Sequence, residues 1–127
     1  MTYKELYLEA KKIRDRAYAP YSEFRVGAAV LTQEGKVYTG VNIENASYPA
    51  GICAERSAFA AAISAGERNF EAIAICGEAG EAWPCGICRQ FMFEFSPNED
   101  LKVVTGPDAD SLEILTIGEL LVKGFRL

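Results

Sequence analysis

The sequence has 127 residues, of which 50% are apolar, and this length fits a single globular domain over residues 1–127. Its formal net charge of −5 disfavours nucleic acid as a partner, since no basic stripe is available to displace counterions from a phosphate backbone. The absence of histidine excludes Ser-His and Cys-His nucleophilic mechanisms and every imidazole metal site.

A helix and a hairpin are predicted for the first third of the chain. Thr2 and Glu5 form a capping-box pattern, and apolar residues then recur at helical spacing, so a first helix should run to about Tyr18. The segments 25–32 and 36–41 are strand-like and flank a turn that contains glycine, which predicts a hairpin.

The middle of the chain is predicted to hold two helices around a strand. After an irregular loop over residues 42–52, Cys53 opens a second helix that Gly66 ends. Because this helix is apolar on all sides, we expect it to be buried. Residues 70–76 form a short buried strand, and a third helix should run from near Cys85 to about Phe95.

The last third contributes two strands, over residues 101–105 and 112–115, and a short helix that a second capping box opens at Thr116. The link between the strands is too short for a parallel crossover, which needs roughly a dozen residues. The two strands should therefore be antiparallel, with the last at or near a sheet edge. The order of elements predicts an α/β fold, a three-layer α/β/α sandwich on a mixed five-stranded sheet.

Neither a secretory signal nor a membrane-spanning run is evident, so we expect a soluble cytoplasmic protein with no membrane partner. In a reducing compartment, its four cysteines are more often metal ligands or redox thiols than a disulfide framework.

Cys53, Cys85 and Cys88 can supply three thiolate ligands to one Zn²⁺ and leave the fourth position of a tetrahedron for water. Glu55 follows Cys53 by two residues and can reach that water without binding the metal. This is the composition of a catalytic zinc site, whereas a structural site more often has a fourth protein ligand.

Two other readings of the cysteines stay open. The Cys85–Cys88 pair, with Trp83 before it, is also typical of a thioredoxin-type redox motif. A redox pair has no use for Cys53 and Glu55 at another helix start, which favours zinc. Cys76 is interpreted as a small buried strand residue. If it were a fourth ligand, the zinc site would be structural.

Zinc with three thiolates carries excess negative charge, which makes a bound water less acidic. The guanidinium of Arg56 or the amide of Gln90 could offset that charge from outside the ligand shell, with Arg89 as a substitute for Arg56. Asn42 and Glu44 suit sugar hydroxyls, although loop polarity explains them equally well. Phe24 and Phe125 are core or interface residues, or they stack on a flat ring.

The sequence resembles the small homotetrameric cytidine deaminases over nearly its whole length. Four segments carry the resemblance: Tyr21-Ser22-x-Phe24-x-Val26-Gly27-Ala28-Ala29, Asn42-Ile43-Glu44-Asn45-Ala46-Ser47-Tyr48, Cys53-Ala54-Glu55-Arg56 and Pro84-Cys85-Gly86-x-Cys88-Arg89-Gln90. The zinc signature of such deaminases includes a glutamate that is not a ligand and a variant with three cysteines.

The resemblance implies one Zn²⁺ per subunit on Cys53, Cys85 and Cys88, with Glu55 as the proton shuttle and Arg56 tempering the thiolates. It also implies a set of substrate contacts. In these, Asn42 and Glu44 hold the ribose 3′-hydroxyl, Phe24 stacks on the pyrimidine, backbone at Ala54 contacts the base, and Tyr48 and Phe125 complete a neighbouring subunit's pocket.

The resulting hypothesis is hydrolytic deamination of cytidine and 2′-deoxycytidine in pyrimidine salvage. A related deaminase acting on a modified nucleoside such as blasticidin S is the nearest alternative. A polynucleotide substrate is disfavoured, because a carboxylate at the 3′-oxygen repels a 3′-phosphate. A non-catalytic zinc module and a thiol oxidoreductase are the alternatives from other classes.

Overall fold

A computed structural model describes all residues from Met1 to Leu127. Its centre is a five-stranded sheet in the order β2-β1-β3-β4-β5, in which only β3 and β4 run parallel. The strands are β1 (Gly27–Thr32), β2 (Val37–Val41), β3 (Phe70–Cys76), β4 (Lys102–Thr105) and β5 (Glu113–Thr116). The mixed five-stranded sheet predicted from the sequence is confirmed.

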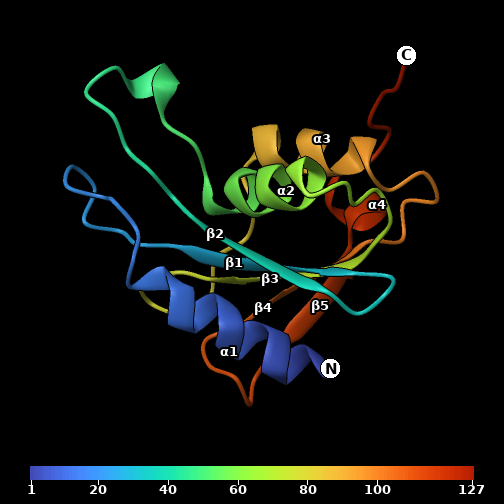
Figure 1. The fold of residues 1–127 in the computed structure, drawn as a ribbon, viewed down its shortest axis with the longest axis horizontal. Coiled ribbons are helices and arrows are strands. Elements are labelled where there is room, and N and C mark those ends of the chain that lie inside the picture. The colour runs from blue at the N-terminus through green and yellow to red at the C-terminus, as the bar shows by residue number, and fades with distance from the viewer.

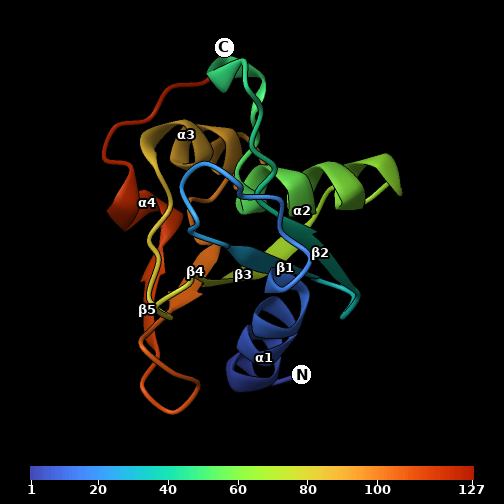
Figure 2. The same ribbon diagram turned by 90° about the vertical axis from the view of Figure 1, so that its left-hand side faces the viewer.

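Helices cover both faces of the sheet and make the three predicted layers. The first helix, α1 (Tyr3–Arg14), lies on one face, and α2 (Ala54–Ser64) and α3 (Gly86–Glu94) lie on the other, with the short α4 (Ile117–Leu120) beside α3 (Figure 1). The view from the side shows the same separation of α1 from the other helices (Figure 2). Each interface has its own apolar cluster, and Phe59 of α2 and Tyr7 of α1 are among the fully buried side chains.

The last two strands are antiparallel and β5 is the edge strand, as the short link between them predicts. Both predicted capping boxes are also present, at Thr2 with Glu5 and at Thr116 with Glu119. None of the helices is long and apolar enough to cross a bilayer.

Helix α1 ends at Arg14 rather than at Tyr18, so this predicted boundary is wrong. The reason is tertiary pairing. The backbone N–H of Tyr18 donates to the carbonyl of Asn42 over 3.1 Å, and the N–H of Glu44 donates to the carbonyl of Tyr18 over 2.8 Å. The chain therefore leaves the helix to pair with the loop after β2.

The burial predicted for α2 holds on one side only. Ala58, Phe59 and Ala62 are buried against the sheet, whereas Ala60 and Ala61 are exposed. The helix lies on the sheet surface, so its outer side faces away from the protein interior.

A close approach between backbones sets the position of α2. A Cβ atom added at Gly40 of β2 would lie 2.3 Å from the backbone nitrogen of Ala58. Strand and helix are thus in direct backbone contact at this point, which any residue larger than glycine prevents. This contact fixes the helix whose first turn carries Glu55.

The loop over residues 42–52 is irregular as predicted, apart from a 3₁₀ turn at Tyr48–Ala50. It projects from the body on the side of the sheet that carries α2, and the C-terminal tail projects on the same side (Figure 1).

Candidate active site

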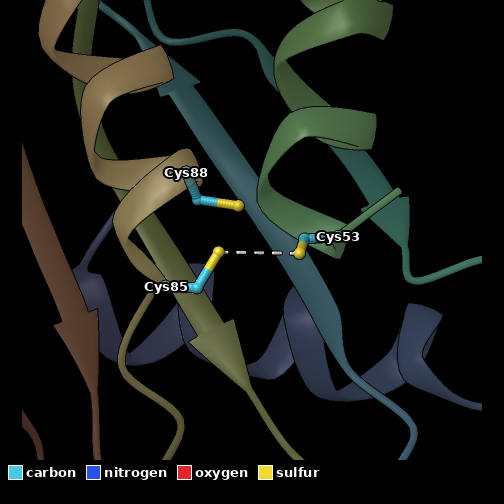
Figure 3. Close-up of side chains that lie close together, drawn as sticks. All are labelled: Cys53, Cys85 and Cys88. Atoms are coloured by element: carbon cyan, nitrogen blue, oxygen red, sulfur yellow. Dashed lines mark hydrogen bonds between the residues drawn. The ribbon is translucent and has the colours of Figure 1, made fainter. Parts of the chain in front are cut away.

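The three cysteines of the predicted zinc site converge from two helix starts. Cys53 is the N-cap of α2, Cys85 is the N-cap of α3, and Cys88 lies in the first turn of α3. Their Sγ atoms lie within 4.8 Å of one another and point towards a common centre, and those of Cys53 and Cys85 are 3.9 Å apart (Figure 3). Tetrahedral zinc with Zn–S distances of about 2.3 Å requires sulfurs about 3.8 Å apart, so the cluster fits one zinc ion.

The two helix starts favour thiolates at this point. Backbone N–H groups in the first turn of a helix lack intrahelical acceptors, and the helix dipole stabilises negative charge there. A hydrogen bond from the Cys88 thiol lowers the pKa of Cys53 to about 5, with the Arg56 guanidinium acting in the same direction. Cys53 is therefore the thiol that deprotonates most readily, whereas the same hydrogen bond and burial raise the pKa of Cys88. Metal binding requires that the ligand thiols be deprotonated.

Cys76 does not belong to the cluster. It is buried among the residues that pack between α1 and the sheet, and its Sγ lies 3.4 Å from Nη1 of Arg14. The structure thus brings together three ligand side chains and no fourth cysteine. A site with three protein ligands is typical of catalytic zinc, which argues against the structural-zinc alternative.

Glu55 lies beside the cluster as a buried carboxyl group. It is the second residue of α2, its side chain is only 5% exposed, and it lines the cavity described below. Burial raises the pKa of Glu55 to about 7, the charge of the Cys53 thiolate acts in the same direction, and a bond from its own backbone N–H opposes them. A carboxyl group that titrates near neutral pH can both accept and return a proton.

Of the three side chains predicted to offset the charge of the thiolates, only Arg56 contacts a cysteine ligand. Nη2 of Arg56 lies 3.7 Å from the Cys53 Sγ, where its charge can offset that of the thiolates. Arg89 instead donates to the backbone carbonyls of Pro84 and Leu120. Gln90 donates to the carbonyl of Phe125 over 3.1 Å, so its amide contacts the C-terminal tail and not a thiolate. No hydrogen bond joins Gln90 to a cysteine ligand, so its predicted role beside the ligands has no contact in support.

A cavity of about 680 Å³ opens beside the cluster. Its lining is mostly apolar and includes Cys53, Cys85 and the predicted residues Phe24, Asn42, Glu44, Tyr48, Ala54, Glu55 and Arg56. An apolar pocket with a few convergent polar groups is typical of small-molecule sites. The backbone N–H of Ala54, at the start of α2, has no intrahelical acceptor and can serve a ligand.

Asn42 and Glu44 line the cavity but also hold the protein backbone. Both amide atoms of Asn42 are engaged, since Oδ1 accepts from the N–H of Val26 over 2.8 Å and Nδ2 donates to the carbonyl of Phe24 over 2.9 Å. The hydrogen bond from the Ser22 hydroxyl, with N–H donors of the same turn, holds the pKa of Glu44 below its usual value. No local sequence pattern indicates this scaffolding, because it depends on pairing between distant loops.

Of the two aromatic residues predicted to complete a neighbouring subunit's pocket, Tyr48 lines the cavity of its own chain and Phe125 does not. Tyr48 is 78% exposed, lies 6.2 Å from Tyr21 between ring centroids, and lines the cavity of its own chain. Phe125 is 66% exposed in the C-terminal tail and does not line the cavity. Their roles between subunits stay predictions.

Trp83, which the sequence presents only as part of a possible redox motif, lines the cavity. Its position directly before Pro84 and Cys85 places it at the metal cluster once those cysteines are read as ligands. Ile43 and Ile52 also line the cavity, and no local pattern marks them.

Comparison with known proteins decides the family. The model of the cytidine and deoxycytidylate deaminase zinc-binding region matches residues 1–105. The chain belongs to this family. It is similar to the cytidine deaminase of Sporosarcina psychrophila, with 43% identity over 126 residues that cover 98% of this chain and 92% of that protein. It is also similar to the cytidine deaminase of Halalkalibacterium halodurans, with 44% identity over 94% of this chain and 91% of that one.

A solved relative shares the whole fold. The crystal structure of cytidine deaminase from Burkholderia pseudomallei superimposes with a TM-score of 0.92 at 46% identity, and the match covers 98% of this chain and 100% of that one. The cytidine deaminase fold is therefore confirmed. The cofactor of this family region is zinc, and the cysteine cluster is the place in this chain that fits it.

Proposed function

We propose that this chain catalyses the hydrolytic deamination of cytidine and 2′-deoxycytidine to uridine and 2′-deoxyuridine, with release of ammonia. The observation that carries the proposal is a buried carboxyl group, Glu55, that lies beside a cluster of three cysteines and lines a cavity of about 680 Å³ together with two of them, Cys53 and Cys85. The names of the similar proteins support a cytosine nucleoside as the substrate.

Cys53, Cys85 and Cys88 would hold one zinc ion per chain, since their sulfurs have the spacing that a tetrahedral ion needs. When bound, zinc supplies Lewis acidity that makes water a nucleophile near neutral pH. Arg56 offsets part of the negative charge of the thiolates through its contact with Cys53.

Glu55 carries the protons in this scheme. It accepts a proton from the attacking water, gives it to ring N3 as oxygen adds to C4, and passes the second proton of the water to the departing amino group. An oxygen atom from water thus replaces the amino group at C4, ammonia leaves, and the carboxylate is regenerated. A pKa of about 7 suits both directions of transfer, and positioned proton transfer contributes roughly 10²–10⁴-fold in rate.

The cavity walls would hold the nucleoside in this orientation. Phe24 would stack on the pyrimidine, the backbone of Ala54 would contact the base, and Asn42 and Glu44 would bind the ribose 3′-hydroxyl. A carboxylate at that oxygen disfavours a 3′-phosphate, which supports a free nucleoside over a polynucleotide.

We further propose a cytoplasmic homotetramer that acts in pyrimidine salvage and shares its active sites between subunits. The support is the exposed apolar surface on the two projecting segments, with Tyr48 in the loop and Phe125 in the tail (Figure 1). Large aromatic side chains are enriched at protein–protein interfaces. In the assembly, these two side chains would complete a neighbouring pocket.

The test is a substrate panel that follows both the ultraviolet absorbance of the base and the release of ammonia. Cytidine and 2′-deoxycytidine should be converted with equal amounts of ammonia and uracil nucleoside. Turnover of blasticidin S alone would move the proposal to the alternative substrate. Efficient editing of cytosine in single-stranded DNA or RNA would contradict the proposal.

A further inference from the structure

Between α1 and β1, the stretch from Tyr21 to Val26 has no regular secondary structure and is held largely by side chains. Side-chain oxygens of four residues accept from its backbone N–H groups, as follows: Tyr21 and Ser22 donate to Glu44, Phe24 to Ser22, Arg25 to Glu78, and Val26 to Asn42. Within it, Glu23 has a φ of 57°, a left-handed conformation that is unusual for a residue with a Cβ. The segment therefore depends on these side chains for its shape.

The Ser22 hydroxyl occupies the centre of this arrangement. It accepts from the N–H of Phe24 over 3.0 Å and donates its own proton to Oε2 of Glu44. A hydroxyl has one donor and two acceptor positions, so both bonds are compatible. The Ser22 side chain thus connects Glu44, the predicted sugar contact, with the backbone of Phe24, whose ring is the predicted base contact.

The two carboxylate oxygens of Glu44 are used unequally. Oε1 accepts from the N–H of Tyr21 over 3.0 Å and of Ser22 over 3.1 Å, which fills its two lone pairs. Oε2 accepts only from the Ser22 hydroxyl and keeps one acceptor position. A ligand hydroxyl in the cavity would therefore bind Oε2, the atom that Ser22 orients.

We propose that Ser22 is a positioning residue that couples recognition of the sugar by Glu44 to recognition of the base by Phe24. Without its hydroxyl, Oε2 loses its fixed direction and the Phe24 N–H loses its acceptor, so both contacts weaken together. The proposal rests on the proposed function, because it assumes that Glu44 and Phe24 bind a nucleoside.

The experiment measures kcat and KM of wild type, Ser22→Ala and Ser22→Thr with two substrates. These are cytidine and 3′-deoxycytidine, which lacks the 3′-hydroxyl that Glu44 is proposed to bind. Ser22→Ala should raise the KM for cytidine about 5- to 30-fold and change kcat less than about 3-fold, since the lost bonds hold substrate in ground and transition state alike. The KM for 3′-deoxycytidine should also rise, through the weakened Phe24 contact, but by a smaller factor, so the preference for cytidine over 3′-deoxycytidine should fall. Ser22→Thr keeps the hydroxyl and should stay within about 3-fold of wild type.

Ser64→Ala serves as the control, because Ser64 is an exposed serine at the far end of α2. It should leave KM, kcat and the preference unchanged. Bound zinc, measured on every variant, should match wild type. Ser22→Ala should lower the Tm only slightly, since the two hydrogen bonds that it removes hold an exposed local segment outside all helices and strands.

Four outcomes overturn the inference. An unchanged KM in Ser22→Ala shows that the hydroxyl does not position the site. A loss that is equal with both substrates, or one that is confined to cytidine, shows that it does not couple sugar to base. Failure of Ser22→Thr to restore the KM excludes the hydroxyl as the cause. Wild-type protein that fails to convert cytidine refutes the proposed function itself, which separates that failure from failure of the Ser22 proposal.

Discussion

Replacing Gly40 of β2 by alanine should weaken zinc binding, because it displaces α2, the helix that begins after the ligand Cys53. The added Cβ would lie 2.3 Å from the backbone nitrogen of Ala58 and 2.7 Å from the carbonyl carbon of Ser57. Backbone atoms of a helix cannot rotate away as a side chain can, so α2 must shift relative to β2.

The size of the effect follows from this distance. Carbon atoms in good contact are about 3.5–4.0 Å apart, so the helix must move by about 1 Å. Metal–ligand distances are fixed to about 0.2 Å, and Cys53 at the start of α2 would leave that range. We expect zinc affinity to fall about 10–100-fold, as when groups that orient ligands are altered. Overpacking should lower stability by about 1–3 kcal/mol, or roughly 4–12 °C in Tm at about 4 °C per kcal/mol.

The assay is competition for zinc against a chelator, with thermal unfolding of the same samples. Gly86→Ala is the control, since a Cβ at Gly86, between the two cysteines of α3, meets no atom within 4 Å. This control should keep the zinc affinity and Tm of wild type. If Gly40→Ala also kept both, the direct contact between β2 and α2 would be refuted.

Two further predictions concern the ligands and the ion pair between Arg25 and Glu78. Cys85→Ala should lose zinc and stability together, because two remaining thiolates bind zinc weakly, and elemental analysis that finds one zinc per chain would contradict its role as a ligand. The Arg25 guanidinium lowers the pKa of Glu78 to about 2 from the usual 4.5, so their pairing stabilises the fold above pH 4.5 and this contribution is lost as the pH falls towards 2. Glu78→Gln should therefore be less stable than wild type at pH 7, and the difference in unfolding free energy should shrink between pH 4.5 and 2. A difference that stays constant over that range would exclude the ion pair as its source.

Features of the fold that depend on local pattern were predictable from the sequence. The capping boxes at Thr2 and Thr116 need only residues three positions apart, and the antiparallel pairing of β4 with β5 follows from the length of the link at Gly106–Ser111. The end of α1 was not predictable in this way, since the pairing of Tyr18 with Asn42 and Glu44 takes the chain out of the helix.

The site shows the same division between chemistry and packing. That the three cysteines lie together could be predicted because few side chains can bind zinc in a chain without histidine. The bond from Gln90 to Phe125 joins residues far apart in the sequence, and no local pattern indicates it. The hydrogen bonds from the N–H groups of Tyr21 and Ser22 to Glu44 likewise join residues that are far apart in the sequence, and no local pattern predicts them.

The central claim is that Glu55 moves protons beside a zinc ion held by Cys53, Cys85 and Cys88. The most direct test compares wild type with Glu55→Gln for loss of cytidine absorbance and for zinc content on the same samples. We predict one zinc per chain in both proteins and a kcat lower by about 10²–10⁴-fold in the variant. A variant that retains both zinc and full activity would contradict the account.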